Sequence, residues 1–266
     1  MPYNTDMNQQ TQEQLIALND QFYQTFGPAF AATRMRIQPG IWALMDEIPM
    51  EGDWLDLGCG NGALGKLWAE QNHKGCYIGL DFSDELLEHA SKLTAGLAGD
   101  GLVLQYMKAG MTDDPWPVED EKITMPLFGE KRVLFDGILS FAALHHIPGS
   151  QVRLNILKHI RRLLKPDGVF IHSEWQFQNS PKLMERRLNP ADVGVDAGQL
   201  EPGDTILDWR FALPGQEEQV GQRYVHLFSE EELAKLALES GFVIEKTWHS
   251  DGKSGNLAMY QRWRTV

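Results

Sequence analysis

The sequence predicts an α/β fold in which a doubly wound, mostly parallel sheet carries helices on both faces. Short apolar segments alternate with helix-like segments from residue 53 to residue 177, the pattern of a parallel sheet covered on both sides. A turn containing Gly58, Gly60 and Gly62 joins the first of these strands to a helix. Two strand-like segments separated by a polar turn end the chain and add an antiparallel hairpin. With 266 residues, 42% of them hydrophobic, the chain is long enough for one domain with a sizeable core.

The N-terminal region is predicted to hold a tail and two helices. Residues 1–10 are polar and are expected to form a loose tail. Apolar residues recur at helical spacing within 11–26, and Gly27 and Pro28 are expected to end that helix. A second helix is expected within 36–49, where it is closed by a proline.

The central region supplies the alternating elements of the sheet. Strands are expected within 53–60, 75–83, 102–110, 134–147 and 169–177. Helices are expected within 63–71, 83–95 and 150–168. Ser83 is a suitable N-cap for the second of these helices, because two acidic residues follow it in the first turn. Residues 111–133 are rich in Asp, Glu and Pro and are expected to form an irregular crossover.

The alternation of strands and helices is interrupted at residues 178–222, which we interpret as an insertion over the active site. Only 203–215 looks like a strand within it. A strand at 224–228 and a helix at 229–242 follow, with Ser229 in the N-cap position. The closing hairpin is expected from the strands 242–250 and 256–264. The predicted single domain therefore comprises a tail (1–10), a helical lid (11–50), a core (51–177 and 223–266) and the insertion (178–222).

Composition excludes several classes of protein. The formal net charge of −13 argues against a broad nucleic-acid-binding face, which is usually basic. No apolar run approaches the roughly 20 residues that span a bilayer, and the N-terminus does not read as a signal peptide. Two cysteines, Cys59 and Cys76, suit a reduced cytoplasmic protein, and no Cys/His cluster has zinc spacing, so no metal site is expected.

The glycine turn suits a cationic cofactor better than a phosphate. A dinucleotide turn has the pattern G-x-G-x-x-G, but Ala63 occupies the position of its third glycine. Asp56, just before the turn, would repel phosphate and attract the ammonium and sulfonium groups of S-adenosylmethionine. Asp81 ends the second strand, where a carboxylate can accept both ribose hydroxyls, and Phe82 offers a wall for adenine. The alternative is a tight turn followed by an ordinary surface acid.

The segments "LDLGCGNGALG", "YIGLDFS", "FDGILSFAALHHI" and "LLKPDG" resemble the class I S-adenosylmethionine-dependent methyltransferases. The resemblance covers roughly residues 50–175 and 223–266. It implies a seven-stranded, Rossmann-like sheet with its last strand antiparallel and the cofactor at the carboxyl ends of the early strands. By this resemblance, the residues along the cofactor are Asp56, Gly58, Cys59, Gly60, Asn61, Asp81, Phe82, Phe141 and Ala142.

The third strand departs from that family's pattern. Many relatives have an acidic residue there for the adenine amine, whereas this chain has Ala109, Gly110 and Met111. We expect backbone groups of Gly110 and Met111 to replace it, with Asp113 as the alternative.

The methyl acceptor is less clearly indicated. Positioning can supply much of the acceleration of methyl transfer, so a dedicated base is not required. His145 and His146 follow the fourth strand and are candidates for proton transfer, or alternatively for capping and cofactor contacts. If the insertion folds over the cofactor, the acceptor would be faced by a cluster of polar and aromatic residues: Asp208, Trp209, Arg210, Arg223, Tyr224 and His226. Otherwise Asp208 and Arg210 form a structural ion pair and Tyr224 packs. Trp175 is a candidate for the acceptor pocket or for the core.

A narrower resemblance concerns the N-terminal "FYQTFGPAFAATR", which is similar to the entry segment of the tRNA wobble-uridine carboxymethyl methyltransferases. It matches at Thr33 and Arg34 and implies that Arg34 binds an acceptor carboxylate or phosphate. Basic residues on the helix within 150–168 are a candidate RNA surface, or else a solvated face. With the net charge of −13, tight RNA binding would need that patch or a small activating subunit.

The sequence thus predicts a cytoplasmic methyltransferase that moves a methyl group from S-adenosylmethionine to an oxygen or nitrogen acceptor. The candidate catalytic residues are His145, Tyr224, Arg34 and Asp208. The acceptor is left open between a modified tRNA uridine and a small molecule. A non-catalytic S-adenosylmethionine-binding partner protein is the alternative from a different class.

Overall fold

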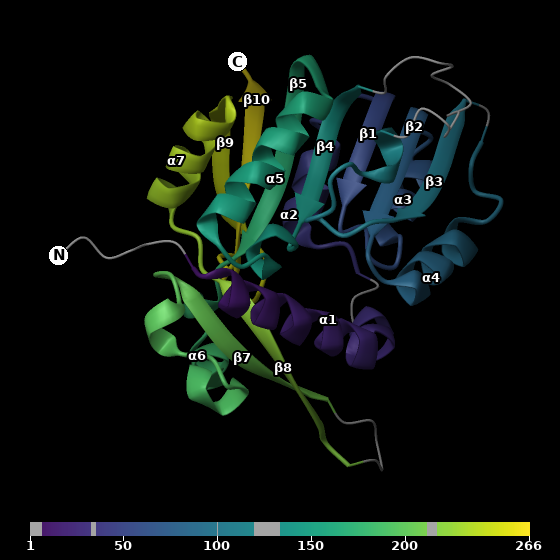
Figure 1. Cartoon of the computed structure of the whole chain (residues 1–266). Helices are drawn as coiled ribbons and strands as arrows, with labels where there is room; N and C mark the ends of the chain where they lie inside the picture. Colours follow the sequence, from purple (N-terminus) through teal and green to yellow (C-terminus); the bar gives the residue numbers. More distant parts are fainter. Residues whose placement is uncertain (1–6, 33–35, 100, 120–133, 212–216) are drawn as a thin grey trace.

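The computed structural model describes residues 7–32, 36–99, 101–119, 134–211 and 217–266, and it confirms the predicted fold class. Seven strands form one sheet in the order β3-β2-β1-β4-β5-β10-β9 (Figure 1). The first five strands in the chain pair in parallel, and β10 is antiparallel to both of its neighbours. The predicted C-terminal hairpin is therefore β9 and β10, at one edge of the sheet. The strands of this sheet are β1 (Glu51–Leu57), β2 (Lys74–Asp81), β3 (Leu102–Lys108), β4 (Phe135–Phe141), β5 (Leu164–Trp175), β9 (Phe242–Ser250) and β10 (Ala258–Thr265).

Helices cover both faces of this sheet. One core cluster joins the sheet to the apolar sides of α5 and α7, and a second joins it to α2 and α3. Neighbouring residues of β1 divide between the two clusters, because successive side chains of a strand point to opposite faces. The α-helices are α1 (Gln9–Ala32), α2 (Pro39–Met45), α3 (Ala63–Glu70), α4 (Asp84–Thr94), α5 (Ser150–Leu163), α6 (Pro181–Met184) and α7 (Glu230–Ser240).

Two of these helices begin at the predicted N-caps. Ser83 Oγ accepts a hydrogen bond of 3.3 Å from the backbone N–H of Leu86, and Ser229 Oγ accepts one of 3.1 Å from that of Glu232. Each bond satisfies one of the unpaired N–H groups that every helix start leaves, and so fixes where the chain leaves the strand or loop before it.

A second, smaller sheet forms below the first and has the order β6-β7-β8 (Figure 1). Its strands are β6 (Arg187–Leu188), β7 (Asp204–Phe211) and β8 (Gln219–His226). The strand expected at 224–228 is thus the end of β8 and pairs with β7, not with the main sheet. The sequence did not indicate this because a short apolar run does not specify its partner strand.

Helix α1 crosses between the main body and the small sheet, and its length corrects one expectation (Figure 1). The helix does not end at Gly27 and Pro28 but continues to Ala32. A proline inside a helix costs about 3 kcal/mol, chiefly through one lost hydrogen bond and one steric clash. The packing of α1 on β8, with Leu15 and Phe22 both buried, outweighs that local preference.

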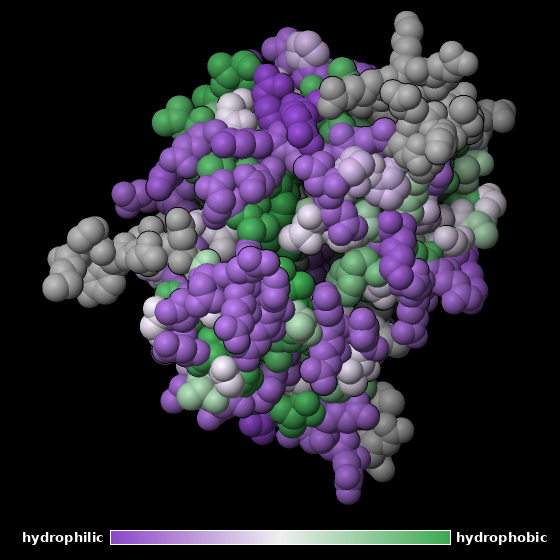
Figure 2. Space-filling model, viewed as in Figure 1, coloured by the Kyte–Doolittle hydropathy of each residue, from purple (hydrophilic) through white to green (hydrophobic). Residues whose placement is uncertain are grey.

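The face in Figure 2 is mainly hydrophilic, with hydrophobic atoms scattered among polar ones. Across the described residues, none of the helices is both long and apolar enough to cross a membrane.

Candidate active site

A cavity of about 930 Å³ opens at the carboxyl ends of the central strands, with α1 along one wall. The ends of β1, β2, β4 and β5 supply most of its floor, and Asn19 and Tyr23 of α1 face it. This is the position in which open α/β sheets bind ligands. All predicted cofactor residues and one predicted catalytic residue line it: Asp56, Gly58, Cys59, Gly60, Asn61, Asp81, Phe82, Gly110, Met111, Phe141, Ala142 and His145.

The glycine turn is held open toward this cavity. The N–H groups of Gly58 and Cys59 donate to the carbonyl oxygen of Leu80 at 2.8 and 3.0 Å, which ties the turn to the end of β2. The φ angle of Gly60 is +54°, a value that favours glycine. A Cβ on Gly62 would lie 2.6 Å from that of Ala90, whereas a Cβ on Gly60 would meet no atom within 4 Å. The space beside Gly60 is therefore open, and a ligand can approach the backbone there.

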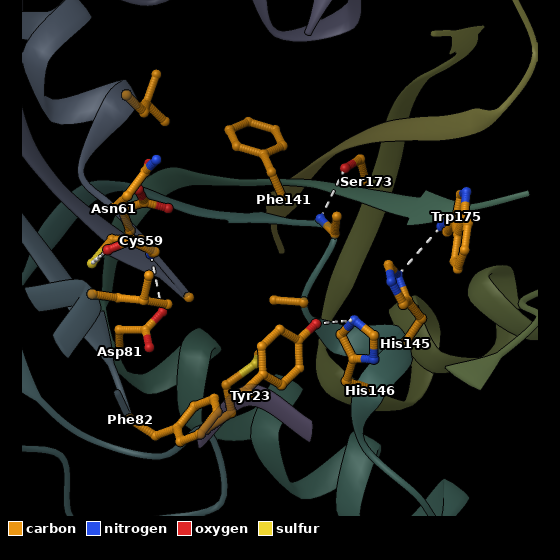
Figure 3. Close-up of a pocket in the computed structure, with 18 of the residues that line it drawn as sticks. Tyr23, Cys59, Asn61, Asp81, Phe82, Phe141, His145, His146, Ser173 and Trp175 are labelled. Carbon is orange, nitrogen blue, oxygen red and sulfur yellow. Dashed lines mark hydrogen bonds between the residues drawn. The ribbon is translucent and has the colours of Figure 1, made fainter. Parts of the chain in front are cut away.

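Asp81 links the turn to the start of α4. One carboxylate oxygen accepts from the N–H of Gly60 at 3.0 Å, and the other accepts from the N–H of Ser83 at 2.9 Å (Figure 3). Burial raises the pKa of Asp81, and these backbone donors oppose the rise. A carboxylate oxygen can accept more than one hydrogen bond, so this fixed group can also receive a pair of hydroxyls from a ligand.

Asp56 adds a second buried carboxylate to the same end of the cavity. Its side chain is 3% exposed and accepts a hydrogen bond from the hydroxyl of Tyr77. Burial raises the pKa of Asp56 to about 7, and the nearby Asp81 adds to the rise. A cation bound beside Asp56 would favour its ionised form, because opposite charges lower the pKa of an acid. Burial also raises the pKa of the Cys59 thiol well above its ordinary value, which argues against a nucleophilic role.

The segment after β3 is ordered by its own side chains. Asp113 accepts a hydrogen bond of 2.7 Å from the N–H of Gly110, and the indole N–H of Trp116 donates to the carbonyl of Gly110 at 3.2 Å. Both backbone groups of Gly110 thus already have partners. Met111 and Asp113 line the cavity beside it, and they are the better candidates for contacts with a ligand.

The turn after β4 holds the chain in an unusual backbone conformation. Ala142 has a φ of +52°, uncommon for a residue with a Cβ. Its N–H donates to both the carbonyl and the hydroxyl of Ser173, each at 3.1 Å. Strained residues of this kind cluster at ligand sites, and here the turn leads from Phe141 into the histidine pair.

Tyr23 and His146 meet across the cavity (Figure 3). Nδ1 of His146 lies 3.2 Å from the backbone carbonyl of Tyr224, which can only accept, so the ring proton resides on Nδ1. Nε2 then accepts from the hydroxyl of Tyr23 at 2.8 Å. The ring of Tyr23 also makes an edge contact with Phe82, at 5.7 Å between centroids. Tyr23 therefore connects Phe82, at the end of the cavity beside β2, to the histidine pair.

His145 has the opposite tautomer. The backbone N–H of Trp175 donates to Nδ1 of His145 at 3.3 Å, which leaves the ring proton on Nε2. Glu174 approaches the same Nδ1 at 3.2 Å and accepts from Nδ1 of His172 at 2.9 Å. All three side chains are buried, and burial raises the pKa of Glu174 well above its ordinary value. Burial thus favours the neutral form of Glu174, which can donate a proton toward His145.

Two other predicted catalytic residues, Tyr224 and Asp208, are not brought to the cavity. The hydroxyl of Tyr224 donates to Asp204 at 2.6 Å, inside a buried network with His226. Asp208 pairs with Arg210 at 2.8 Å on the small sheet. Both arrangements match the structural alternative for these residues. Arg34 lies outside the described residues.

Sequence reasoning did not single out Tyr23, which lines the cavity. Helical spacing was the available signal for Tyr23, because Ile16, Asn19 and Tyr23 lie on one face of α1. Of the cluster that was expected to face the acceptor, Arg223 lines the cavity.

Comparisons with known proteins agree with this geometry. The family described as "Methyltransferase domain" matches residues 25–247. The tRNA (carboxymethyluridine(34)-5-O)-methyltransferase of Schizosaccharomyces pombe is 26% identical over 247 residues, covering 86% of this chain and 92% of that protein. The protein of the same name from Arabidopsis thaliana is 27% identical over 185 residues, covering 69% of this chain but only 39% of its own length. A SAM-dependent methyltransferase of Methanosarcina mazei shares the fold, with a TM-score of 0.61 at 20% identity, covering 86% of this chain and 98% of that one.

Proposed function

Because this chain belongs to the methyltransferase domain family, we propose that it transfers the methyl group of S-adenosylmethionine to a carboxylate oxygen of a modified tRNA uridine. The cofactor supplies an electrophilic methyl group on a positively charged sulfur. The open space beside Gly60 would let the cofactor lie against the backbone of the turn. The fixed carboxylate of Asp81 suits its ribose, and the buried carboxylate of Asp56 suits its cationic end.

One observation carries the choice of acceptor. The unprotonated nitrogen of each histidine already accepts a hydrogen bond, from Trp175 N–H in His145 and from Tyr23 in His146. A hydroxyl or amine acceptor often needs a base to remove its proton. A carboxylate is already ionised at neutral pH and needs none. The pair therefore suits an acceptor that arrives as an anion, which agrees with the carboxymethyluridine named as the substrate of the two relatives.

The protein's part in this reaction is positioning. Asp81 and the glycine turn would fix the cofactor, while Tyr23 and His145 bound the space into which the acceptor enters. Holding two reactants in line can lower the barrier by about 7–11 kcal/mol without further chemistry from the protein.

Recognition of tRNA would depend on a partner. On α5, Arg153 is buried and pairs with Glu201 at 2.6 Å, and Lys165 at the start of β5 pairs with Asp136 at 2.8 Å. These basic residues are thus committed within the chain, whose net charge is −13. We infer that a small activating subunit contributes phosphate contacts.

We also propose a cytoplasmic location, because Cys59 and Cys76 are buried free thiols.

The test is label transfer followed by alkali. The protein is incubated with methyl-labelled S-adenosylmethionine and bulk tRNA, with and without a clarified extract of its source cells, and the D81A variant is the control. Label in tRNA that mild alkali releases as methanol would support the proposal, because a methyl ester is hydrolysed there and an N-methyl group is not. Alkali-stable label, or label only in small molecules of the extract, would contradict it.

A further inference from the structure

A buried guanidinium lines the cavity at the end that holds the histidine pair. Arg223 of β8 is 4% exposed, and its Cζ lies 4.8 Å from the ring centroid of Trp175 and 5.5 Å from that of Phe22. Trp175 donates its backbone N–H to His145, and Phe22 precedes Tyr23 in α1. Both aromatic neighbours of Arg223 are therefore directly linked to His145 and Tyr23, the residues that border the acceptor space.

The two rings determine how the guanidinium can bind another group. A guanidinium that lies over an aromatic ring engages it through its face. Its N–H groups lie in the plane and form the fork that matches the two oxygens of a carboxylate. Burial strengthens such an ionic hydrogen bond, because water screens it less. The aromatic contacts engage the face of the guanidinium and so help to fix the position of Arg223.

The charges of the cavity differ between its two ends. Asp56 and Asp81 are buried at the end beside the glycine turn. Lys108 also lines the cavity, but it is exposed and forms an ion pair with Asp84. A buried cation at one end and buried carboxylates at the other suit a pair of reactants of opposite charge.

We propose that Arg223 binds the anionic group of the methyl acceptor, a carboxylate, while Phe22 and Trp175 hold the guanidinium in place. The identity of the acceptor rests on the function proposed above. The N–H fork would hold the carboxylate by both oxygens, and a remaining lone pair of one oxygen would face the methyl group. Arg223 is then a residue that determines specificity for the charge of the acceptor.

The experiment compares wild type with R223Q, R223K and R210Q. Arg210 is a matched control because it lies on the same small sheet, is half exposed and pairs with Asp208 outside the cavity. Calorimetry first measures the affinity of each protein for S-adenosylhomocysteine. The complexes are then titrated with two nucleosides, 5-carboxymethyluridine and its neutral analogue 5-carbamoylmethyluridine. Methyl transfer to tRNA is measured in parallel.

We expect wild type and R210Q to bind the carboxylate nucleoside at least about tenfold more tightly than the amide, since a charge-assisted hydrogen bond is worth that much. R223Q should lose this preference and R223K should keep part of it, while all four bind S-adenosylhomocysteine equally. An unchanged preference in R223Q, no preference in wild type, or a parallel loss of S-adenosylhomocysteine binding in R223Q would overturn the proposal.

The two proposals fail in different ways. If wild type does not methylate tRNA but shows a carboxylate preference that R223Q loses, the tRNA function is wrong and the anion site stands. If wild type methylates tRNA and R223Q does so with the same kcat and KM, the anion site is wrong and the function stands.

Discussion

The phenol oxygen of Tyr23 in α1 lies 2.8 Å from Nε2 of His146, the last residue of the 3₁₀ turn η2 (Leu144–His146). This bond ties the helix over the cavity to the loop that leaves β4. We predict that Y23F lowers the rate of methyl transfer by up to about tenfold, the usual worth of one neutral hydrogen bond. Its affinity for S-adenosylhomocysteine should change less than about twofold, because the ring still contacts Phe82. Single-turnover kinetics would check this, and a wild-type rate in Y23F would contradict it.

Asp81 is predicted to control cofactor affinity. In D81N an amide NH2 group replaces one carboxylate oxygen and cannot accept a hydrogen bond. The backbone N–H of either Gly60 or Ser83 therefore loses its partner. We expect at least about a tenfold loss of affinity for S-adenosylhomocysteine by calorimetry. D84N, at an exposed acid three residues along the chain, is the control and should bind like wild type. Equal affinities for D81N and D84N would place the ribose elsewhere.

Asp56 is predicted to make the stability of the ligand-free protein depend on pH. Its pKa is about 7 in the folded protein against an ordinary value of 3.8, so the folded state binds the proton more tightly. This contribution is fully present below about pH 4 and is lost as the pH rises through 7. Wild type should therefore lose up to about 4 kcal/mol of unfolding free energy relative to D56N between pH 4 and pH 8. Urea unfolding across that range measures it, and parallel profiles for the two proteins would refute the assignment.

Glu174 is predicted to tolerate replacement by glutamine. In its neutral form it can donate toward Nδ1 of His145 and accept from His172, and an amide can do both. E174Q should keep its methyl-transfer rate at pH 7 within about threefold, whereas E174A should lose about 1–3 kcal/mol of stability because it leaves the buried Nδ1 of His172 without its partner. A large loss of rate in E174Q, with stability retained, would mean that Glu174 is an anion facing a protonated His145.

The parts of the fold and site that the sequence indicates are local ones. The glycine turn, Asp81 and the N-cap Ser83 lie within a few residues of one another, and each has a conformational or hydrogen-bonding requirement that shows in the residue type. The alternation of strands and helices indicates a parallel sheet covered on both faces, and the family resemblance implies its seven strands with an antiparallel last one. All predicted cofactor residues consequently line one cavity.

What the sequence does not indicate depends on contacts between distant segments. Tyr224 and Asp208 lie among aromatic residues, but only the pairing of β7 with β8 decides which way each side chain points. The same strand sends Arg223 into the cavity and Tyr224 away from it, because neighbouring residues of a strand face opposite sides. Tyr23 reaches its partner across more than a hundred residues of sequence, and no local pattern signals that distance.

The separation of charge along the cavity bears on how a turnover ends. In the proposed reaction, a sulfonium and a carboxylate become a thioether and an ester, so one positive and one negative charge disappear together. The ester no longer has the charge that Arg223 would attract, and the thioether no longer has the charge that Asp56 would attract. The electrostatic field that gathers the reactants would then hold the products less firmly, and the chemical step itself would begin their release.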